Sequence, residues 1–170
     1  MFAKILIVDK DNKAVGSASM DEAHLKGLAH RIVRVFLFNT KGQVFLQKRS
    51  STVSFPGLWD QSVGGHVDEG EDNLQAAKRE TEEEVGLKDL ELHEVGTYYS
   101  EATLPNGQLK RFNILYTAIS DVSVTLDPDE VESGKWVTLE ELDQLIKDKP
   151  EDFTGGLIRA LEFYRENKTV

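Results

Sequence analysis

Three glutamates in the middle of the chain, Glu80, Glu83 and Glu84, have a spacing that suggests chemistry. Residues 72–85 contain no Gly or Pro, and their apolar side chains recur every three or four positions, which predicts an amphipathic helix. At about 100° per residue, the three carboxylates fall on one narrow side of this helix, beside its buried face. Such crowding of like charges near the negative end of the helix dipole opposes helix stability. A divalent cation reverses that cost, because hard ions such as Mg²⁺ and Mn²⁺ prefer carboxylate oxygens.

A solvated helix face is the alternative explanation, and for residues 81–84 taken alone it is the commoner one. The longer segment 65–87, however, fits the pattern G-x5-E-x7-R-E-U-x-E-E-x-G-U, where U is a bulky aliphatic residue. With each residue type at roughly 5–8%, the seven fixed positions match by chance with a probability on the order of 10⁻⁸ to 10⁻⁹. Thr81, at the first U position, is the one departure. Since Thr is β-branched and similar in size to Val, we expect slightly weaker packing and unchanged chemistry.

The pattern resembles the signature of the Nudix hydrolase family. This resemblance implies a layered α/β/α sandwich of the α+β type with a mixed β-sheet, in which a loop–helix–loop carries the motif. It also implies divalent-metal-dependent hydrolysis of a diphosphate linked to another group, with Mg²⁺ or Mn²⁺ as the cofactor. In such a reaction the metal neutralises charge on the diphosphate and acidifies a bound water, while a free carboxylate takes the proton.

The resemblance assigns roles to individual residues. It implies metal ligation by Glu80, Glu83, Glu84 and the main-chain carbonyl of Gly64. It implies an ion pair between Glu71 and Arg79 that keeps loop and helix in register. The identity of the general base stays open: Glu130 is a candidate outer acid, and a solvated loop acid is the equally good alternative for this residue.

Three basic side chains near the motif are candidates for binding the diphosphate. Lys48 and Arg49 end a predicted strand ahead of the motif, and His66 directly follows Gly65. For Lys48 and Arg49, an exposed strand edge explains their positions equally well. For His66, a surface or supporting position is the commoner outcome.

Residues 24–140 resemble, more specifically, the branch of Nudix proteins that includes type I isopentenyl-diphosphate isomerase. In that isomerase a cysteine before a Gly-His pair and a glutamate on a later strand carry out protonation, and histidines with acids hold a metal. Here Gly64 stands at the cysteine position, and residues 109–113 contain no acid. Three histidines lie near the positions of the isomerase's metal ligands: His24, His30 and His66.

The complete R-E-x-x-E-E set, which the isomerase generally lacks, favours a hydrolase on an isomerase-like scaffold. Isomerisation of a C5 diphosphate is one alternative. A non-catalytic diphosphate-binding module is the other, and the intact set of acids disfavours it.

Helices and strands around the motif follow from hydrophobic periodicity, turn residues and helix caps. We expect strands over residues 4–8, 13–17, 31–38, 43–48, 98–100, 111–119 and 134–137. We expect helices over residues 21–27 and 72–85, a third beginning at Thr138 with a capping box to Glu141, and a last one capped by Thr154. The Pro105-Asn106-Gly107 sequence predicts a hairpin turn. Strands outnumber helices, as in α+β or layered α/β/α proteins.

The composition narrows the class of protein. A chain of 170 residues with 39% hydrophobic and 29% charged residues is typical of one globular domain. We expect residues 1–170 to form this single domain, in which residues 1–29 are an N-terminal extension of a strand and a helix. A net charge of −10 disfavours a nucleic-acid polymer as partner, and the absence of Cys excludes thiolate zinc sites and disulfides. The apolar stretch 5–8 is too short for a signal peptide or membrane span. We therefore expect a cytoplasmic monomer or homodimer that acts on a small-molecule diphosphate.

Overall fold

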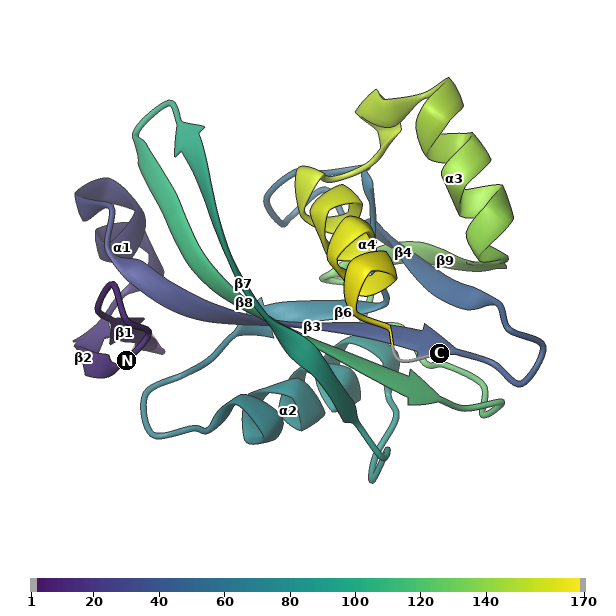
Figure 1. Ribbon diagram of the computed structural model, residues 1–170, viewed down its shortest axis with the longest axis horizontal. Helices are drawn as coiled ribbons and strands as arrows, with labels where there is room; N and C mark the ends of the chain where they lie inside the picture. Colours follow the sequence, from purple (N-terminus) through teal and green to yellow (C-terminus); the bar gives the residue numbers. More distant parts are fainter. Residues whose placement is uncertain (1–2, 169–170) are drawn as a thin grey trace.

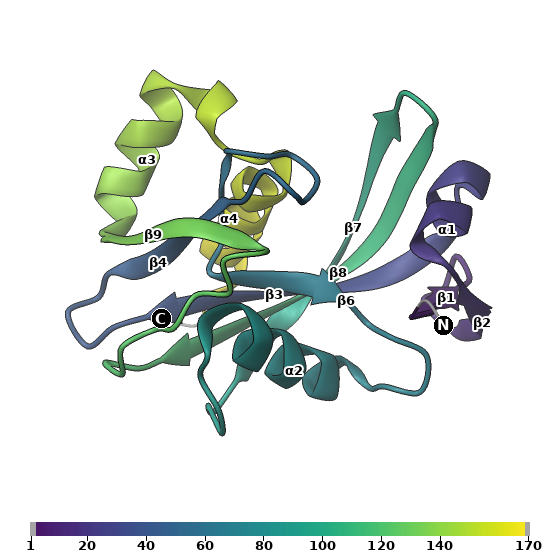
Figure 2. The same ribbon diagram turned by 180° about the vertical axis from the view of Figure 1, so that it is seen from behind.

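A nine-stranded mixed β-sheet with helices on both faces forms the centre of the computed structural model, which describes residues 3–168 (Figures 1 and 2). In chain order its elements are β1 (Ile5–Val8), β2 (Ala14–Ala18), α1 (Met20–Lys26), β3 (Ala29–Phe38), β4 (Val44–Arg49), β5 (Trp59–Asp60), β6 (Val63–His66), α2 (Asn73–Val85), β7 (His93–Leu104), β8 (Gly107–Ile119), β9 (Val131–Val137), α3 (Leu139–Asp148), the 3₁₀ turn η1 (Pro150–Asp152) and α4 (Gly155–Asn167). Strands β3 and β8 pair in parallel, and the other pairs are antiparallel. The predicted layered α+β class with a mixed sheet is confirmed.

Strand β3 lies in the middle of the sheet and separates two apolar cores. Because side chains alternate along a strand, Val33 and Val35 point to one face and Phe36 to the other. The first face packs against α2 and includes Ala77, and the second packs against α4 and includes Leu157. Helices α2 and α4 accordingly cover opposite faces of the sheet (Figure 1). None of the helices in residues 3–168 has the length and apolar character that crossing a bilayer requires.

Helix α2 carries the acidic motif, and its ends are set by local chemistry. Asp72 caps the N-terminus in a reciprocal capping box with Gln75, and Gly86 ends the helix with a positive φ of 70°. Thr81, the one departure from the pattern, is buried, and its hydroxyl donates to the carbonyl of Ala77 at 2.7 Å. The hydroxyl is therefore satisfied within the helix, and the core accepts Thr at this position.

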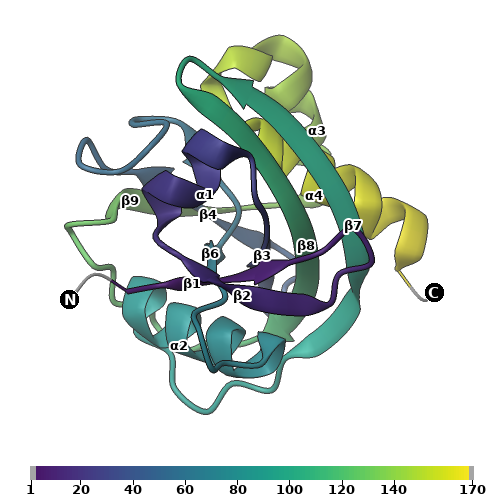
Figure 3. The same cartoon turned by 90° about the vertical axis from the view of Figure 1, so that its left-hand side faces the viewer.

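The N-terminal segment adds a strand pair and a short helix to one end of the sheet (Figure 3). Strand β1 pairs with both β2 and β3, and α1 lies against β8. At the start of β8, a Cβ on Gly107 would approach the carbonyl oxygen of His24 to 2.2 Å. Only glycine permits this contact between α1 and the hairpin, so Gly107 helps to determine where His24 lies.

Several predicted boundaries differ from the structure. The predicted hairpin is present, but its two-residue turn is Pro105-Asn106, and Gly107 already belongs to β8. Strands β7 and β9 are longer than predicted because their outer parts are polar and exposed, which conceals the strand pattern. The short strands β5 and β6 were not predicted. The predicted caps are present: Thr138 begins α3 in a capping box with Glu141, and Thr154 caps α4.

Candidate active site

Arg79 on α2 is the hydrogen-bonding centre of the acidic motif. Its guanidinium donates two parallel bonds to Glu71, from Nε to Oε1 at 2.7 Å and from Nη2 to Oε2 at 2.9 Å. Nη1 donates to Glu80 at 2.8 Å and to Glu83 at 3.2 Å, and Nη2 also donates to the main-chain carbonyl of His66 at 3.0 Å. The ion pair expected between Glu71 and Arg79 is thus present. One side chain ties the loop before α2, the helix itself and β6 together.

The three glutamates of the motif differ in burial. Glu84 is 3% exposed and Glu80 is 8% exposed, whereas the side chain of Glu83 is 49% exposed. This order follows from the helix, because Glu84 lies nearest in angle to the apolar face and Glu83 lies farthest from it. Of the three carboxylates of the motif, those of Glu80 and Glu84 are therefore inside the protein, and that of Glu83 borders solvent.

Burial raises the pKa of both interior carboxyl groups. Desolvation raises the pKa of Glu80 to about 7, although Arg79 opposes the shift. Desolvation and the neighbouring charge of Glu80 raise the pKa of Glu84 well above its ordinary value. One arginine therefore does not compensate the negative charge of this cluster. Such uncompensated carboxylates are suited to a cation.

Strand β6 passes close to the carboxylates. The amide of Gly64 donates to Glu84 at 3.2 Å, and the side chain of Gln47 on β4 donates to the same oxygen at 2.7 Å. A Cβ on Gly65 would lie 2.0 Å from the carboxyl carbon of Glu80. Glycine at position 65 is required for this close approach. Sequence reasoning missed Gln47; a polar residue within the apolar run of β4 was the available signal.

Glu130, the candidate outer acid, lies beside this cluster. Its carboxyl group interacts with Glu84, and burial raises its pKa, with Asp127 and Glu83 as further causes. Arg49 acts in the opposite direction and lowers the pKa of Glu130. The structure therefore brings a fourth acid, from the loop before β9, to the three acids of α2.

The predicted phosphate-binding residues on β4 already have protein partners. Lys48 forms an ion pair with Glu132 at 3.6 Å. Arg49 donates to Asp60 at 3.1 Å and to the main-chain carbonyl of Ser54 at 2.6 Å. Arg49 is consequently held at the β4–β5 loop, close enough to influence Glu130 but fixed by other bonds.

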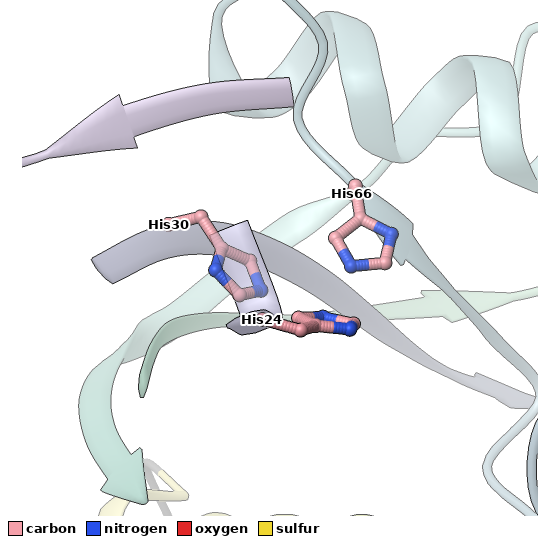
Figure 4. A group of neighbouring side chains, drawn as sticks. All are labelled: His24, His30 and His66. Atoms are coloured by element: carbon pink, nitrogen blue, oxygen red, sulfur yellow. The ribbon is translucent and has the colours of Figure 1, made fainter. Parts of the chain in front are cut away.

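His66 differs most from its predicted position. Gly65 lies against Glu80. Because side chains alternate along β6, the side chain of His66 points to the opposite face of the sheet. The imidazole of His66 points toward His24 of α1 and His30 of β3 (Figure 4). Ring centroids are 5.3 Å apart for His30 and His66, 5.5 Å for His24 and His30, and 6.4 Å for His24 and His66. The structure thus groups the three histidines and separates them from the carboxylates.

Comparison with known proteins decides the family. The family model described as NUDIX domain matches residues 28–155, about three quarters of the chain. The chain belongs to the Nudix family. An isopentenyl-diphosphate Δ-isomerase of Serratia proteamaculans is 34% identical over 160 residues, which cover 93% of this chain and 89% of that protein. The uncharacterised Nudix hydrolase YfcD of Escherichia coli is 30% identical over 159 residues, covering 93% and 84%.

Solved structures agree with this assignment. DR0079 of Deinococcus radiodurans superposes with a TM-score of 0.78 and 28% identity, covering 98% of this chain and 99% of that one. The NUDIX domain of Shewanella oneidensis NrtR, solved with ADP ribose, has a TM-score of 0.64 at 23% identity, over 83% of this chain and 89% of that one, and shows the same fold. Together the Nudix domain and the Nudix hydrolase relative identify a pyrophosphohydrolase of the Nudix type.

Proposed function

We propose that this Nudix protein uses Mg²⁺ or Mn²⁺ to hydrolyse the diphosphate linkage of a nucleoside diphosphate joined to another group, or of a related organic diphosphate. The observation that carries the proposal is the cluster of Glu80, Glu83, Glu84 and Glu130, in which two carboxylates are buried and a single arginine bonds to three of the motif's acids. Nudix hydrolases in general use divalent metal ions.

The donor set fits a hard divalent cation. Glu80 and Glu84 present buried carboxylate oxygens with raised pKa values, and the absence of a side chain at Gly65 lets Glu80 approach β6 closely. The residues that would hold the ion are Glu80, Glu83, Glu84 and the carbonyl of Gly64. When bound, Mg²⁺ or Mn²⁺ supplies Lewis acidity at the diphosphate oxygens and makes a coordinated water more acidic.

The chain's own residues hold the reacting groups in place. Arg79 orients Glu80 and Glu83, while Gln47 and the amide of Gly64 fix Glu84. Two of these acids are buried, so their oxygens are directed by fixed donors instead of by solvent. The orientation of these acids is therefore set before a substrate arrives.

Glu130 is our choice for the group that accepts the proton of the attacking water. It lies outside α2, next to Glu84, and burial raises its pKa toward the range of an effective base. In-line attack of this water on one phosphorus forms a new P–O bond and breaks the bridging P–O bond, so that each product keeps one phosphate group. Glu71 takes no part in this step, because both its oxygens are occupied by Arg79.

Isomerisation of a C5 diphosphate is the second candidate, favoured by the 34% identical relative. The site disfavours it. Gly64 stands where the resemblance places a cysteine, and on β8 the residues beside the histidines are Arg111 and Asn113, neither of which is an acid. Without an acid–base pair at these two positions, we propose hydrolysis and not proton transfer to an alkene.

A substrate panel tests the proposal. Phosphate and nucleotide release should be measured with ADP-ribose, nucleotide sugars, dinucleotides, oxidised nucleotides and prenyl diphosphates, with Mg²⁺ or Mn²⁺ and with EDTA. ADP-ribose is included because the NUDIX domain of NrtR was solved with it. We expect metal-dependent turnover of at least one substrate class.

Matched variants of α2 give the control. Glu84→Gln should lower kcat by about 100-fold or more, because it removes a carboxylate that would hold the metal ion at the reacting diphosphate. Glu82→Gln changes the same charge on the same helix, but Glu82 pairs with Lys88 at the surface, and this variant should match the wild type. No turnover with any metal, or equal rates for both variants, contradicts the proposal.

A further inference from the structure

The sheet face opposite α2 carries a second group of ionisable side chains. In the sheet register, His30 of β3 is paired with Arg111 of β8, and Ile32 is paired with both Asn113 and His66. Paired and alternate residues share a face, so His30, His66 and Arg111 point to the same side. Helix α1 adds His24, and Figure 4 shows the three histidines side by side. We call His24, His30, His66 and Arg111 the histidine–arginine cluster.

Four nitrogens of the histidine–arginine cluster are buried without a partner. Among residues 3–168, Nε2 of His24, His30 and His66 and Nε of Arg111 form no hydrogen bond. The three imidazoles can each direct one nitrogen to within 4.8 Å of the others. In His30, which has no exposed surface, Nδ1 contacts the carbonyl of Leu28 at 3.0 Å, so Nε2 is the free nitrogen. Buried polar atoms nearly always have partners, and four orphans at one place indicate a missing ligand.

The charge of the surroundings determines which ligand fits. In the described chain no carboxylate forms an ion pair with Arg111, and the neighbouring buried Arg34 donates to the neutral amides of Asn113 and Gln61. Asp60 is the acid that acts electrostatically on Arg111, but Arg49 and Thr154 already bond to it. A guanidinium removed from water without a counter-charge is unfavourable. The cluster therefore lacks an anion.

A transition metal is the competing ligand, because three imidazole nitrogens suit Zn²⁺ and similar ions. Such an ion would add two positive charges beside Arg111 and Arg34, and the cluster offers it no carboxylate. An oxyanion instead satisfies the orphan nitrogens and the charge together. For His30, whose Nδ1 faces Leu28, the neutral ring can accept at Nε2 from a P–OH group of a phosphate.

We propose that His24, His30, His66 and Arg111 form a binding site for an oxyanion of the phosphate type. The site lies across β6 from the carboxylates of α2, because Gly65 faces Glu80 and the next residue, His66, faces the cluster. The oxyanion site does not rest on the proposed function.

Calorimetric titration of the EDTA-treated full chain with inorganic phosphate tests the site. Wild-type protein should bind phosphate, and Arg111→Gln should bind it about 10- to 100-fold more weakly, as expected for the loss of a charge-assisted hydrogen bond. Lys110→Gln is the matched control: it removes the same charge from the adjacent residue of β8, whose side chain lies on the opposite face, and it should bind as the wild type does.

His24→Gln provides a second variant in case Arg111→Gln does not fold, because His24 lies on α1 at the edge of the sheet. It too should weaken phosphate binding. No phosphate binding by the wild type, or equal affinities in the wild type, Arg111→Gln and His24→Gln, overturns the oxyanion site. Stoichiometric Zn²⁺ binding that is lost in His24→Gln, with no phosphate binding, overturns it in favour of a metal site.

One further measurement separates this site from the catalytic one. Phosphate titration of Glu84→Gln should match the wild type even though hydrolysis is lost, so the oxyanion site stands or falls independently of the proposed activity.

Discussion

Replacing Glu80 by Gln is expected to stabilise the metal-free protein at pH 8. The pKa of Glu80 is about 7 in the folded protein, against an ordinary value of 4.5 for a glutamate in water. Since one pKa unit corresponds to 1.36 kcal/mol, keeping this carboxylate ionised in the fold costs roughly 3 kcal/mol. Gln resembles the protonated form in shape and removes the charge, so roughly 3 kcal/mol is the upper limit of the gain.

The sign of the effect depends on pH. A carboxyl group whose pKa is raised by folding carries no penalty below the unfolded pKa, near 4.5. The penalty grows as pH rises from 4.5 and is complete above the folded pKa of about 7. Wild type and Glu80→Gln should therefore have similar free energies of unfolding at pH 4.5 and differ most at pH 8.

Urea unfolding in EDTA at pH 4.5 and pH 8 measures this difference. Glu82→Gln is the control, since Glu82 is exposed and its replacement should change stability by less than about 0.5 kcal/mol. Saturating Mg²⁺ should narrow the difference at pH 8: at 100 times the dissociation constant it stabilises the wild type by about 2.7 kcal/mol, and the variant by less. A gain that is the same at both pH values, or a loss at pH 8 without metal, would refute this reasoning.

Three further predictions concern the same site. Arg79→Lys retains the charge but loses the two parallel bonds to Glu71, so the free energy of unfolding should fall by about 1–3 kcal/mol in chemical denaturation; an unchanged value contradicts the central role of the guanidinium. Gly65→Ala brings a Cβ to 2.0 Å from the carboxyl carbon of Glu80 and should lower kcat by at least roughly tenfold. Gly16→Ala is the control: its Cβ would have no atom within 4 Å, so this variant should keep wild-type activity. Equal activities of the two variants contradict the need for glycine at position 65. Isopentenyl diphosphate incubated with the enzyme in D₂O should incorporate no deuterium by NMR, and incorporation would establish isomerase chemistry.

The motif helix and its caps could be predicted from the sequence, because each depends on local spacing. In helix α2 apolar residues recur every three or four positions without a break. The side chains of Thr138 and Thr154 accept hydrogen bonds from main-chain amides three residues further along the chain. The relative order of burial of Glu80, Glu83 and Glu84 also follows from helix angles. Their absolute burial does not, because β6 and its glycine pair cover the helix on that side.

Features that depend on sheet register could not be predicted. Strand β6 has four residues, two of them glycine, so it lacks the alternation that marks a strand. The resemblance to the isomerase groups His24, His30 and His66, but without the parallel pairing of β3 with β8 nothing indicates that Arg111 shares their face. The sequence contains the residues of the histidine–arginine cluster, but only long-range pairing brings them together.

The central claim is that the acids of α2 exist to bind a divalent metal together with a diphosphate. The most direct test of this claim is a calorimetric titration of the metal-free protein with Mn²⁺. The titration is done in the presence of a methylene-bridged diphosphate analogue, which cannot be hydrolysed. We expect saturable binding by the wild type and by Glu82→Gln, and binding at least roughly tenfold weaker after the loss of a carboxylate ligand in Glu83→Gln and Glu84→Gln. Absence of binding by the wild type, or equal affinity in all four proteins, would contradict the claim.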